Sequence, residues 1–291
     1  MYLWGGEPML YKGSVEIIEE AASMGMPPSI ATNATGLAQH AERLVAAPMF
    51  VVQISVDGAD AATHNACRPG ANPAVDNFAT INQAIEKIRE IRADRGQRLP
   101  LIASLTTINN LNYDKLVDVY ESFRDKVDVC VFYLAWWIDQ ESAEKHAHDF
   151  EERFGFRPEK HFGWIGSWTP PDYGILSSQL KQLQAKAAGL SGPGLVIMPP
   201  VSEPDQLEAY YTDHAQRFGF DKCNHIFTAV EINSNGDMSP CRDYHDFVVG
   251  NVKEKTITEL WNSGPYRKFR QSLTDKGLMP ACTRCCGLMG Y

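Results

Sequence analysis

Four cysteines in the last quarter of the chain have the residue type and spacing of a metal site. They are Cys223, Cys241, Cys282 and Cys285, which are separated by 17, 40 and 2 residues. The first two flank a turn sequence around Gly236, and the last two share one tight turn, so the four thiolates can face one centre. Such a set holds either a structural zinc ion or an iron–sulfur cluster, and spacing alone leaves both open. Cys286 is a further candidate ligand.

A second set of candidate residues follows three predicted strands near the N-terminus. Gly5-Gly6, Asn33 and Ser55 end successive strands, and Arg68 follows 13 residues after Ser55. In α/β folds the carboxyl ends of parallel strands form the ligand-binding edge of the sheet. Backbone carbonyls near Gly5-Gly6 can accept from an ammonium, while Ser55 and Arg68 can donate to a carboxylate. The pattern predicts a site for an amino-acid moiety.

Two acidic residues lie in the same strand-end segments. Glu7 and Asp57 have the chemistry of an acid or a base. At strand ends, however, we expect both to make structural hydrogen bonds.

The elements that must position these residues alternate between strands and helices. Apolar runs predict strands at 1–5, 29–33, 50–55, 101–108 and 127–137, and helical patterns predict helices at 15–24, 37–47, 78–91 and 113–123. Ser14 is the predicted N-cap of the first helix and Gly25 its stop. This alternation requires parallel crossovers, so we expect an α/β sheet, open or curled into a barrel. No strand precedes the first one, so we expect a missing element upstream.

The rest of the chain is predicted to form two further segments, giving domains at 1–137, 138–220 and 221–291. The middle segment reads as an insert with a helix at 177–188 and a short strand at 195–198. In the last, strands at 228–232 and 238–241 flank an Asn-Gly turn, which is a strong hairpin signal. One helix with Thr256 or Thr258 near its start follows the hairpin.

Composition limits the classes of partner and location. The net charge is −9 and the basic residues are dispersed, which disfavours nucleic acid. The sequence has no apolar run of about 18 residues and no secretion signal, so we expect no membrane partner and a cytoplasmic location. In that reducing compartment the seven cysteines are not a disulfide framework, and Cys67 and Cys130 read as ordinary buried thiols.

The strand-end motifs resemble those of radical S-adenosylmethionine (SAM) enzymes. The motifs are Gly-Gly-Glu-Pro at 5–8, Thr-Asn at 32–33, Ser-x-Asp-Gly at 55–58 and the downstream Arg68, and the tail resembles the SPASM or twitch auxiliary-cluster domain. The resemblance implies that Gly5, Gly6, Glu7 and Pro8 contact the methionine amino group, with Asn33 close by. It implies that Ser55 and Arg68 bind the carboxylate, and that Cys223, Cys241, Cys282 and Cys285 ligate an auxiliary 4Fe-4S cluster. It therefore favours iron–sulfur over zinc.

By the same resemblance, we expect a partial parallel (βα) TIM-like barrel lacking its first strand, plus a small α+β auxiliary-cluster domain. The implied chemistry is hydrogen abstraction by a 5′-deoxyadenosyl radical, supported by an electron donor such as flavodoxin or ferredoxin. Peptide or protein modification is the leading substrate class, and dehydrogenation of a small alcohol is the second. No residue is assigned a catalytic role.

Two departures from the family pattern bear on this expectation. The Cys-x3-Cys-x2-Cys loop that binds the catalytic 4Fe-4S cluster is absent from the sequence, so we expect that cluster only in an intact protein from which an N-terminal segment is missing here. Tyr291 stands where a full SPASM domain has its next cysteine, so a one-cluster twitch domain fits better. The alternative is a non-catalytic scaffold whose four cysteines hold a structural zinc or iron–sulfur site.

Overall fold

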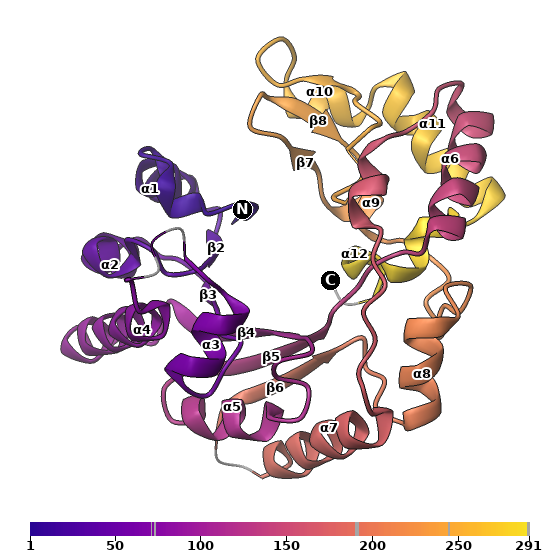
Figure 1. Ribbon diagram of the computed structural model, residues 1–291. Helices are drawn as coiled ribbons and strands as arrows, with labels where there is room; N and C mark the ends of the chain where they lie inside the picture. The colour runs from indigo at the N-terminus through magenta and orange to yellow at the C-terminus, as the bar shows by residue number, and fades with distance from the viewer. Residues whose placement is uncertain (71, 73, 190–191, 244, 290–291) are drawn as a thin grey trace. The chain divides into compact units, whose positions relative to one another are not determined.

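The protein is described here from a computed structural model that covers residues 1–70, 72, 74–189, 192–243 and 245–289 (Figure 1). The chain divides into two compact units: unit 1 comprises Met1–Ala135 with Pro170–Pro204, and unit 2 comprises Trp136–Thr169 with Asp205–Tyr291. The segment 138–220, expected as one insert, is thus shared between the units. The three-domain division stays a prediction. No helix in the described ranges is long and apolar enough to cross a membrane.

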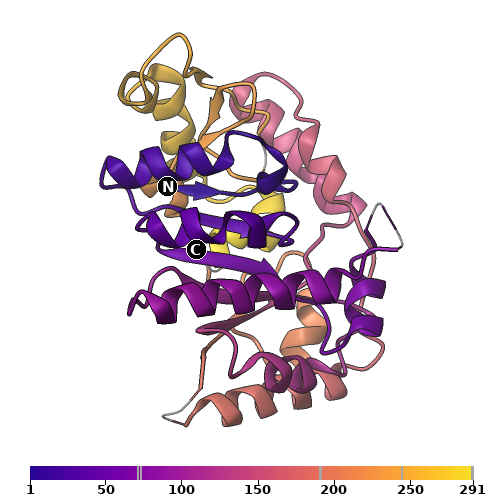
Figure 2. The ribbon, with the colours of Figure 1, turned by 90° about the vertical axis from the view of Figure 1, so that its left-hand side faces the viewer.

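Unit 1 is built on a six-stranded parallel sheet in which the strands follow one another in sequence order. The strands are β1 (Tyr2–Leu3), β2 (Ser29–Thr32), β3 (Val51–Ser55), β4 (Leu101–Ile108), β5 (Val129–Leu134) and β6 (Gly194–Met198). This topology, with its curved sheet, confirms the predicted partial TIM-like barrel (Figures 1 and 2).

The helices of unit 1 connect successive strands. They are the 3-10 helix η1 (Pro8–Leu10) and the α-helices α1 (Ser14–Ser23), α2 (Leu37–Ala46), α3 (Ala61–Cys67), α4 (Asn77–Asp94), α5 (Leu116–Phe123) and α7 (Tyr173–Ala187). Figures 1 and 2 show α1, α2 and α4 packed side by side along one face of the sheet. The core lies under these helices, where Ile30, Val52 and Ile54 are fully buried. Strand residues of the opposite face, such as Gln53 and Ser55, are only half-buried.

Two details of unit 1 differ from expectation. Helix α3 was not predicted, because only His64 among its seven residues is buried and no apolar stripe marks it. Ser14 is not the N-cap of α1; Gly13 occupies that position, and the Ser14 hydroxyl donates to the carbonyls of Pro8 and Tyr11. The serine therefore fixes the turn before the helix rather than its first amides.

Unit 2 combines short helices with a three-stranded antiparallel sheet in the order β7-β8-β9. Its strands are β7 (Glu231–Ile232), β8 (Asp237–Ser239) and β9 (Gly250–Asn251). Its helices are α6 (Gln140–Phe154), η2 (Lys160–Trp164), α8 (Pro204–Thr212), α9 (His225–Thr228), α10 (Ile257–Trp261), α11 (Gly264–Lys276), η3 (Pro280–Arg284) and α12 (Cys286–Met289). An aromatic core containing Phe150, Phe154, Phe247 and Phe269 holds the unit together.

The predicted hairpin is present in unit 2, but its strands are shorter than expected. Gly236 takes φ +95° in the turn, and its amide donates to the Asn233 carbonyl at 2.8 Å. The first predicted strand, 228–232, was wrong at its start, because Thr228 belongs to α9. The single helix predicted after the hairpin is two helices, because Ser263 caps α11 by accepting from the Tyr266 amide at 3.3 Å. Strand β9 was not predicted.

Candidate cofactor site and cysteine cluster

The strand-end residues of unit 1 lie along one edge of the sheet. Because β1, β2 and β3 are adjacent and parallel, Gly5-Gly6, Asn33 and Ser55 all follow or end strands at the carboxyl edge. Gly5 and Gly6 have φ values of +90° and +49°, which glycine adopts without strain. A side chain at either position would meet no atom within 4 Å. Their backbone is therefore open to close approach by a ligand.

Glu7 fixes this glycine turn to the end of β2. Its Oε1 accepts from the Met9 amide at 3.0 Å and from the Thr32 hydroxyl at 2.6 Å, while Oε2 accepts from the Asn33 amide at 2.7 Å. Pro8 follows as the first residue of η1. The carboxylate thus makes the structural hydrogen bonds expected of it, so any cofactor contact from this segment comes through its backbone. The Asn33 side chain caps its own turn through the Thr35 amide at 2.9 Å.

Arg68 is held beside the third strand end by a buried carboxylate. Asp57 is 3% exposed, and its Oδ2 accepts from Arg68 Nε at 2.6 Å while Oδ1 accepts from the Thr107 amide at 2.8 Å. Burial raises the pKa of Asp57, against the opposing effect of the Arg68 charge. One edge of the guanidinium is therefore committed to Asp57. The Arg68 side chain as a whole is 33% exposed, so its remaining donors are available to a ligand.

The approach of α3 to the third strand end depends on Gly58. A Cβ at this position would stand 2.3 Å from the His64 amide nitrogen, so no larger residue fits without moving the helix. His64 Nδ1 accepts from the Asp57 amide at 3.2 Å. Burial, followed by the charge of Arg68, lowers the pKa of His64 to about 4. The Ser-x-Asp-Gly sequence thus packs α3 tightly and places Arg68 at its end.

The four predicted cysteine ligands all lie in unit 2, on segments that converge on its core. Cys223 precedes α9, Cys241 follows β8, Cys282 lies in η3 and Cys285 ends that helix. The thiols of Cys223, Cys241 and Cys282 pack against the same hydrophobic cluster. Cys223 and Cys241 flank the Gly236 turn as predicted, but α9 lies between Cys223 and the hairpin.

The surroundings of these thiols favour their protonated form. Burial raises the pKa of Cys282 to about 12, and the neighbouring Cys223 contributes to this rise. Burial also raises the pKa of Cys223, to which the charge of Asp243 adds. Cys285 Sγ donates to Asp243 Oδ2 at 2.7 Å. Buried thiols of this kind become thiolates readily only beside a positive centre, which fits a metal-ligand role.

The spacing of the donor set bears on which metal centre it suits. Among the described residues, no three His, Cys, Asp or Glu side chains are grouped as ligands of a single metal ion. Four sulfurs around one zinc would stand about 3.8 Å apart, given Zn–S bonds of about 2.3 Å. In a four-iron cluster each thiolate binds a different iron, so the sulfurs lie further apart. The side chain of Cys286 lies outside the described part of the structure.

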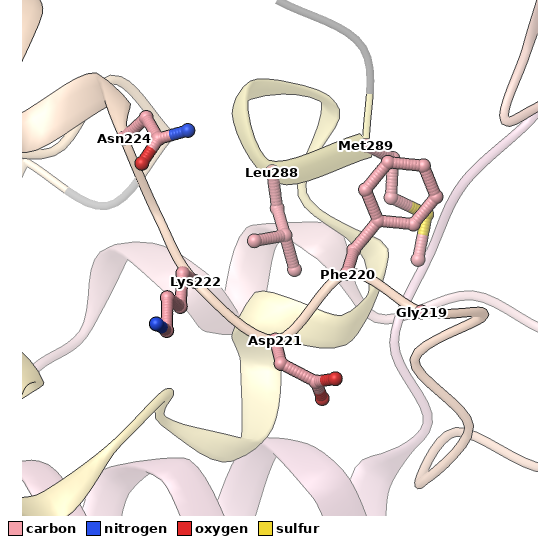
Figure 3. A pocket seen from close by; sticks show the side chains of 7 residues that line it. All are labelled: Gly219, Phe220, Asp221, Lys222, Asn224, Leu288 and Met289. Carbon is pink, nitrogen blue, oxygen red and sulfur yellow. The ribbon is translucent and has the colours of Figure 1, made fainter.

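A pocket adjoins the segment that carries Cys223 (Figure 3). It has a volume of about 520 Å³ and is lined by Gly219, Phe220, Asp221, Lys222, Asn224, Leu288 and Met289. Figure 3 shows the Phe220 ring beside the Met289 side chain, with Lys222 and Asn224 further along the same loop segment. The pocket therefore offers an apolar end and a polar end next to a predicted cluster ligand.

Comparison with known families identifies both parts of the chain. Residues 1–123 match the radical SAM superfamily, and residues 223–286 match an iron–sulfur cluster-binding domain of the SPASM type. The chain thus combines a radical SAM domain with a SPASM domain. With its SPASM domain, this radical SAM chain is of a class that uses S-adenosylmethionine and 4Fe-4S clusters.

Known relatives match over most of this radical SAM chain. AdoMet-dependent heme synthase from Methanosarcina barkeri is 26% identical over 97% of this chain and 74% of its own length. The enzyme of the same name from Nitratidesulfovibrio vulgaris is 24% identical over 97% of this chain and 70% of its own. SuiB from Streptococcus suis has a similar fold, with TM-score 0.61, 14% identity and coverage of 98% of this chain and 61% of its own. SuiB bound to its precursor peptide SuiA matches as well.

Several residues outside the two sites take positions that the sequence did not reveal. His146 and His161 are both fully buried, with ring centroids 4.6 Å apart, whereas the neighbouring His148 is exposed. Asp243 was not identified from the sequence as a partner of the cysteine cluster, although it lies only two residues after Cys241. Cys130 is buried as expected, whereas Cys67 is half-buried beside Asn109.

Proposed function

We propose that this chain holds S-adenosylmethionine at the carboxyl edge of the unit 1 sheet, as part of a radical SAM enzyme that abstracts hydrogen atoms when the catalytic 4Fe-4S cluster is also present. The observation that supports this most directly is the convergence of Gly5-Gly6, Asn33, Ser55 and Arg68 on that edge, within the region that matches the radical SAM superfamily. When bound beside a reduced 4Fe-4S cluster, S-adenosylmethionine supplies a 5′-deoxyadenosyl radical that removes a hydrogen atom from the substrate.

In this proposal the chain's own residues bind and orient the methionine part of the cofactor. Backbone carbonyls at Gly5 and Gly6 accept from its ammonium group, and Glu7 and Pro8 hold that turn in place. Ser55 and Arg68 donate to its carboxylate, with Asn33 alongside. Asp57 keeps the guanidinium in position through the 2.6 Å ion pair. Such a charge-assisted contact is geometrically specific.

A second part of the proposal concerns unit 2, where Cys223, Cys241, Cys282 and Cys285 hold one auxiliary 4Fe-4S cluster. The shared core contact of three of the thiols and the influence of Cys223 on Cys282 support this. The pocket beside Cys223 in Figure 3 is a suitable place for substrate near that cluster.

For the substrate, we propose a tetrapyrrole in a heme-forming reaction as the first candidate. The support is the similarity to two AdoMet-dependent heme synthases, which extends over 97% of this chain and includes both sites. Peptide or protein modification is the second candidate, because the fold is shared with SuiB, which has been solved with a precursor peptide bound. Dehydrogenation of a small alcohol stays a prediction of the sequence alone.

The remaining partners follow from the chemistry. Reduction of the clusters calls for a one-electron donor such as flavodoxin or ferredoxin, and oxygen-sensitive clusters with free thiols fit the reducing cytoplasm. The net charge of −9 makes nucleic acid an unfavourable partner, and we propose no membrane partner.

Anaerobic reconstitution with iron and sulfide tests the metal part of the proposal against the scaffold alternative. We expect about four irons and four sulfides per chain, their loss in the double variant Cys282→Ala/Cys285→Ala, and their retention in the control Cys67→Ala. One zinc without labile sulfide would instead identify a structural site. It would remove the cluster from the proposal and favour the non-catalytic scaffold.

A further inference from the structure

Asn112 is fully buried in unit 1, although asparagine is mostly an exposed residue in folded proteins. It lies in the turn that follows β4, at the carboxyl edge of the sheet, and β4 is the neighbour of β3. It is not among the residues proposed to contact the cofactor. A buried amide is hydrogen-bonded, so its partners show which segments it holds together.

The side chain of Asn112 uses both ends of its amide. Its Oδ1 accepts from the Asn109 amide at 2.8 Å. Its Nδ2 donates to the carbonyl of Thr107 at 3.1 Å and to the carbonyl of Asp57 at 3.0 Å, so both N–H donors are used. The side chain therefore ties the turn after β4 to the segment after β3.

This tie continues the pairing of the two strands beyond the backbone ladder. The Val56 amide donates to the Leu105 carbonyl at 2.8 Å. Beyond that bond, side chains join the two segments: the Thr106 hydroxyl donates to the Val56 carbonyl at 2.6 Å, and Asn112 donates to the next carbonyl, that of Asp57. Asn112 thus takes the place of a strand amide at the point where the ligand-binding edge begins.

Asp57 is the residue that this arrangement fixes. Asn112 holds its carbonyl, and its Oδ1 accepts from the Thr107 amide at 2.8 Å, so the main chain and the carboxylate are both attached to the β4 side. Oδ2 is left for Arg68 Nε at 2.6 Å. The other donor to the Asp57 carbonyl among the described residues is the Cys67 thiol at 3.6 Å, which is weak. The position of the guanidinium therefore depends on Asn112 through Asp57.

The turn after β4 has bonds of its own besides those of Asn112. Asn109 Oδ1 accepts from the Leu111 amide at 2.8 Å, and the Asn109 carbonyl accepts from the Tyr113 amide at 3.0 Å. The donor from Asn112 to Asp57 is the bond of this side chain that leaves the turn. Closing the turn and holding Asp57 are therefore separate tasks of one side chain.

We propose that Asn112 is a positioning residue for the cofactor carboxylate: through Asp57, it places the Arg68 guanidinium where it donates to that group. Because Asn112 is fully buried, it acts without touching the cofactor. This inference rests on the proposed function, in which Arg68 binds the methionine carboxylate of S-adenosylmethionine. Loss of Asn112 should therefore weaken the part of the binding that comes from the carboxylate and leave the rest.

Two probes separate this role from a general structural one. S-adenosylmethionine carries the carboxylate, whereas decarboxylated S-adenosylmethionine keeps the ammonium and the nucleoside without it. Asn112→Leu is similar in size and has no hydrogen-bonding group. By equilibrium dialysis with the reconstituted full chain, we expect this variant to lose about tenfold in affinity for S-adenosylmethionine and less than about twofold for the decarboxylated probe. The control Asn82→Leu removes a donor to the Phe78 carbonyl within α4 and should change neither affinity.

Arg68 provides a second test through a double-mutant cycle. In an Arg68→Gln background, Asn112→Leu should change the affinity for S-adenosylmethionine by less than about twofold, because no guanidinium remains to be positioned. A measurement on the unsubstituted chain does not depend on whether Asn112→Leu folds. Coupling between the carboxylate site and this turn is reciprocal, so S-adenosylmethionine should slow hydrogen exchange in residues 107–112 more than the decarboxylated probe does.

The outcomes distinguish this role from the cofactor site on which it rests. Equal losses for the two probes, additive losses with Arg68→Gln, or equal protection of residues 107–112 by both probes would overturn the role of Asn112 while the cofactor site stands. If the unsubstituted chain binds neither probe, the proposed cofactor site is wrong and the role of Asn112 falls with it.

Discussion

At the scale of single residues, the Arg68 guanidinium depends on Asp57 for its position. The pair is 2.6 Å apart, and the carboxylate is almost completely buried. Arg68→Lys keeps the charge but loses the planar fork that can bond Asp57 and a cofactor carboxylate together. Charged hydrogen bonds contribute about 1.5–3 kcal/mol, so we expect affinity for S-adenosylmethionine to fall roughly 10- to 100-fold. Equilibrium dialysis of labelled cofactor with the reconstituted chain measures this.

A matched control for Arg68→Lys is available at the opposite edge of the same sheet. Arg92 Nη1 lies 2.7 Å from Asp128 Oδ2, and Asp128 immediately precedes β5. Arg92→Lys therefore breaks a similar ion pair away from the strand ends. It should lower stability without weakening cofactor binding. Equal losses of affinity in the two variants would mean that Arg68 acts only through the fold.

His64 should give unit 1 a measurable sensitivity to acid. Its pKa in the folded chain is about 4, below the ordinary value of 6.5, so the unfolded chain binds the proton more readily between these values. The stability that depends on neutral His64 is complete above pH 6.5 and is lost as the pH falls toward 4. Protonation also breaks the bond from the Asp57 amide to Nδ1. The denaturant concentration at the unfolding midpoint should therefore drop more between pH 7 and pH 5 in the wild type than in His64→Gln.

The exposed His148 provides the comparison for this pH effect. It pairs with Glu152 at 3.2 Å on the solvated side of α6. His148→Gln should keep the pH dependence of the wild type. If His64→Gln keeps it too, the buried ring does not titrate as expected.

At the scale of elements, the packing of α3 rests on one glycine. Gly58→Ala places a Cβ 2.3 Å from the His64 amide nitrogen, so α3 must shift and move Arg68 with it. Overpacking of this kind costs about 1–3 kcal/mol. We expect that loss of unfolding free energy, together with weaker S-adenosylmethionine binding. In Gly163→Ala, where the new methyl meets no atom within 4 Å, neither quantity should change appreciably. If Gly58→Ala is destabilised but binds the cofactor as tightly as the wild type, the position of α3 does not affect the cofactor site.

The same elements show why the sequence predicts some features and not others. The sheet order follows from alternating strands and helices, so the common edge of Gly5-Gly6, Asn33 and Ser55 was predictable. The strand prediction over 228–232 began too early because Thr228, Val230 and Ile232 alternate with two other residues as in a strand, whereas Thr228 is the last residue of α9. The environments of Asn112 and Asp243 depend on contacts with residues 55 and 42 positions away, which no local pattern encodes.

At the scale of the whole molecule, the chain crosses three times between two units, each of which carries a different predicted cofactor site. Unit 1 carries the strand-end edge, and unit 2 carries all four predicted cysteine ligands. Five of the six tryptophans also lie in unit 2, namely Trp136, Trp137, Trp164, Trp168 and Trp261. Tryptophan fluorescence therefore reports mainly on unit 2, while far-ultraviolet circular dichroism reports on both units.

This division predicts that loading the cysteines with iron and sulfide stabilises unit 2 selectively. A ligand present at about 1,000 times its dissociation constant raises the free energy of unfolding by about 4 kcal/mol. For a unit of this size, that corresponds to a rise of roughly 10 °C or more in melting temperature. We expect the fluorescence transition to rise by that amount on reconstitution, while a circular dichroism transition stays at its original temperature. Cys282→Ala/Cys285→Ala should abolish the rise. One transition that shifts as a whole by both probes would show instead that the two units unfold together, so that a centre in unit 2 stabilises the entire chain.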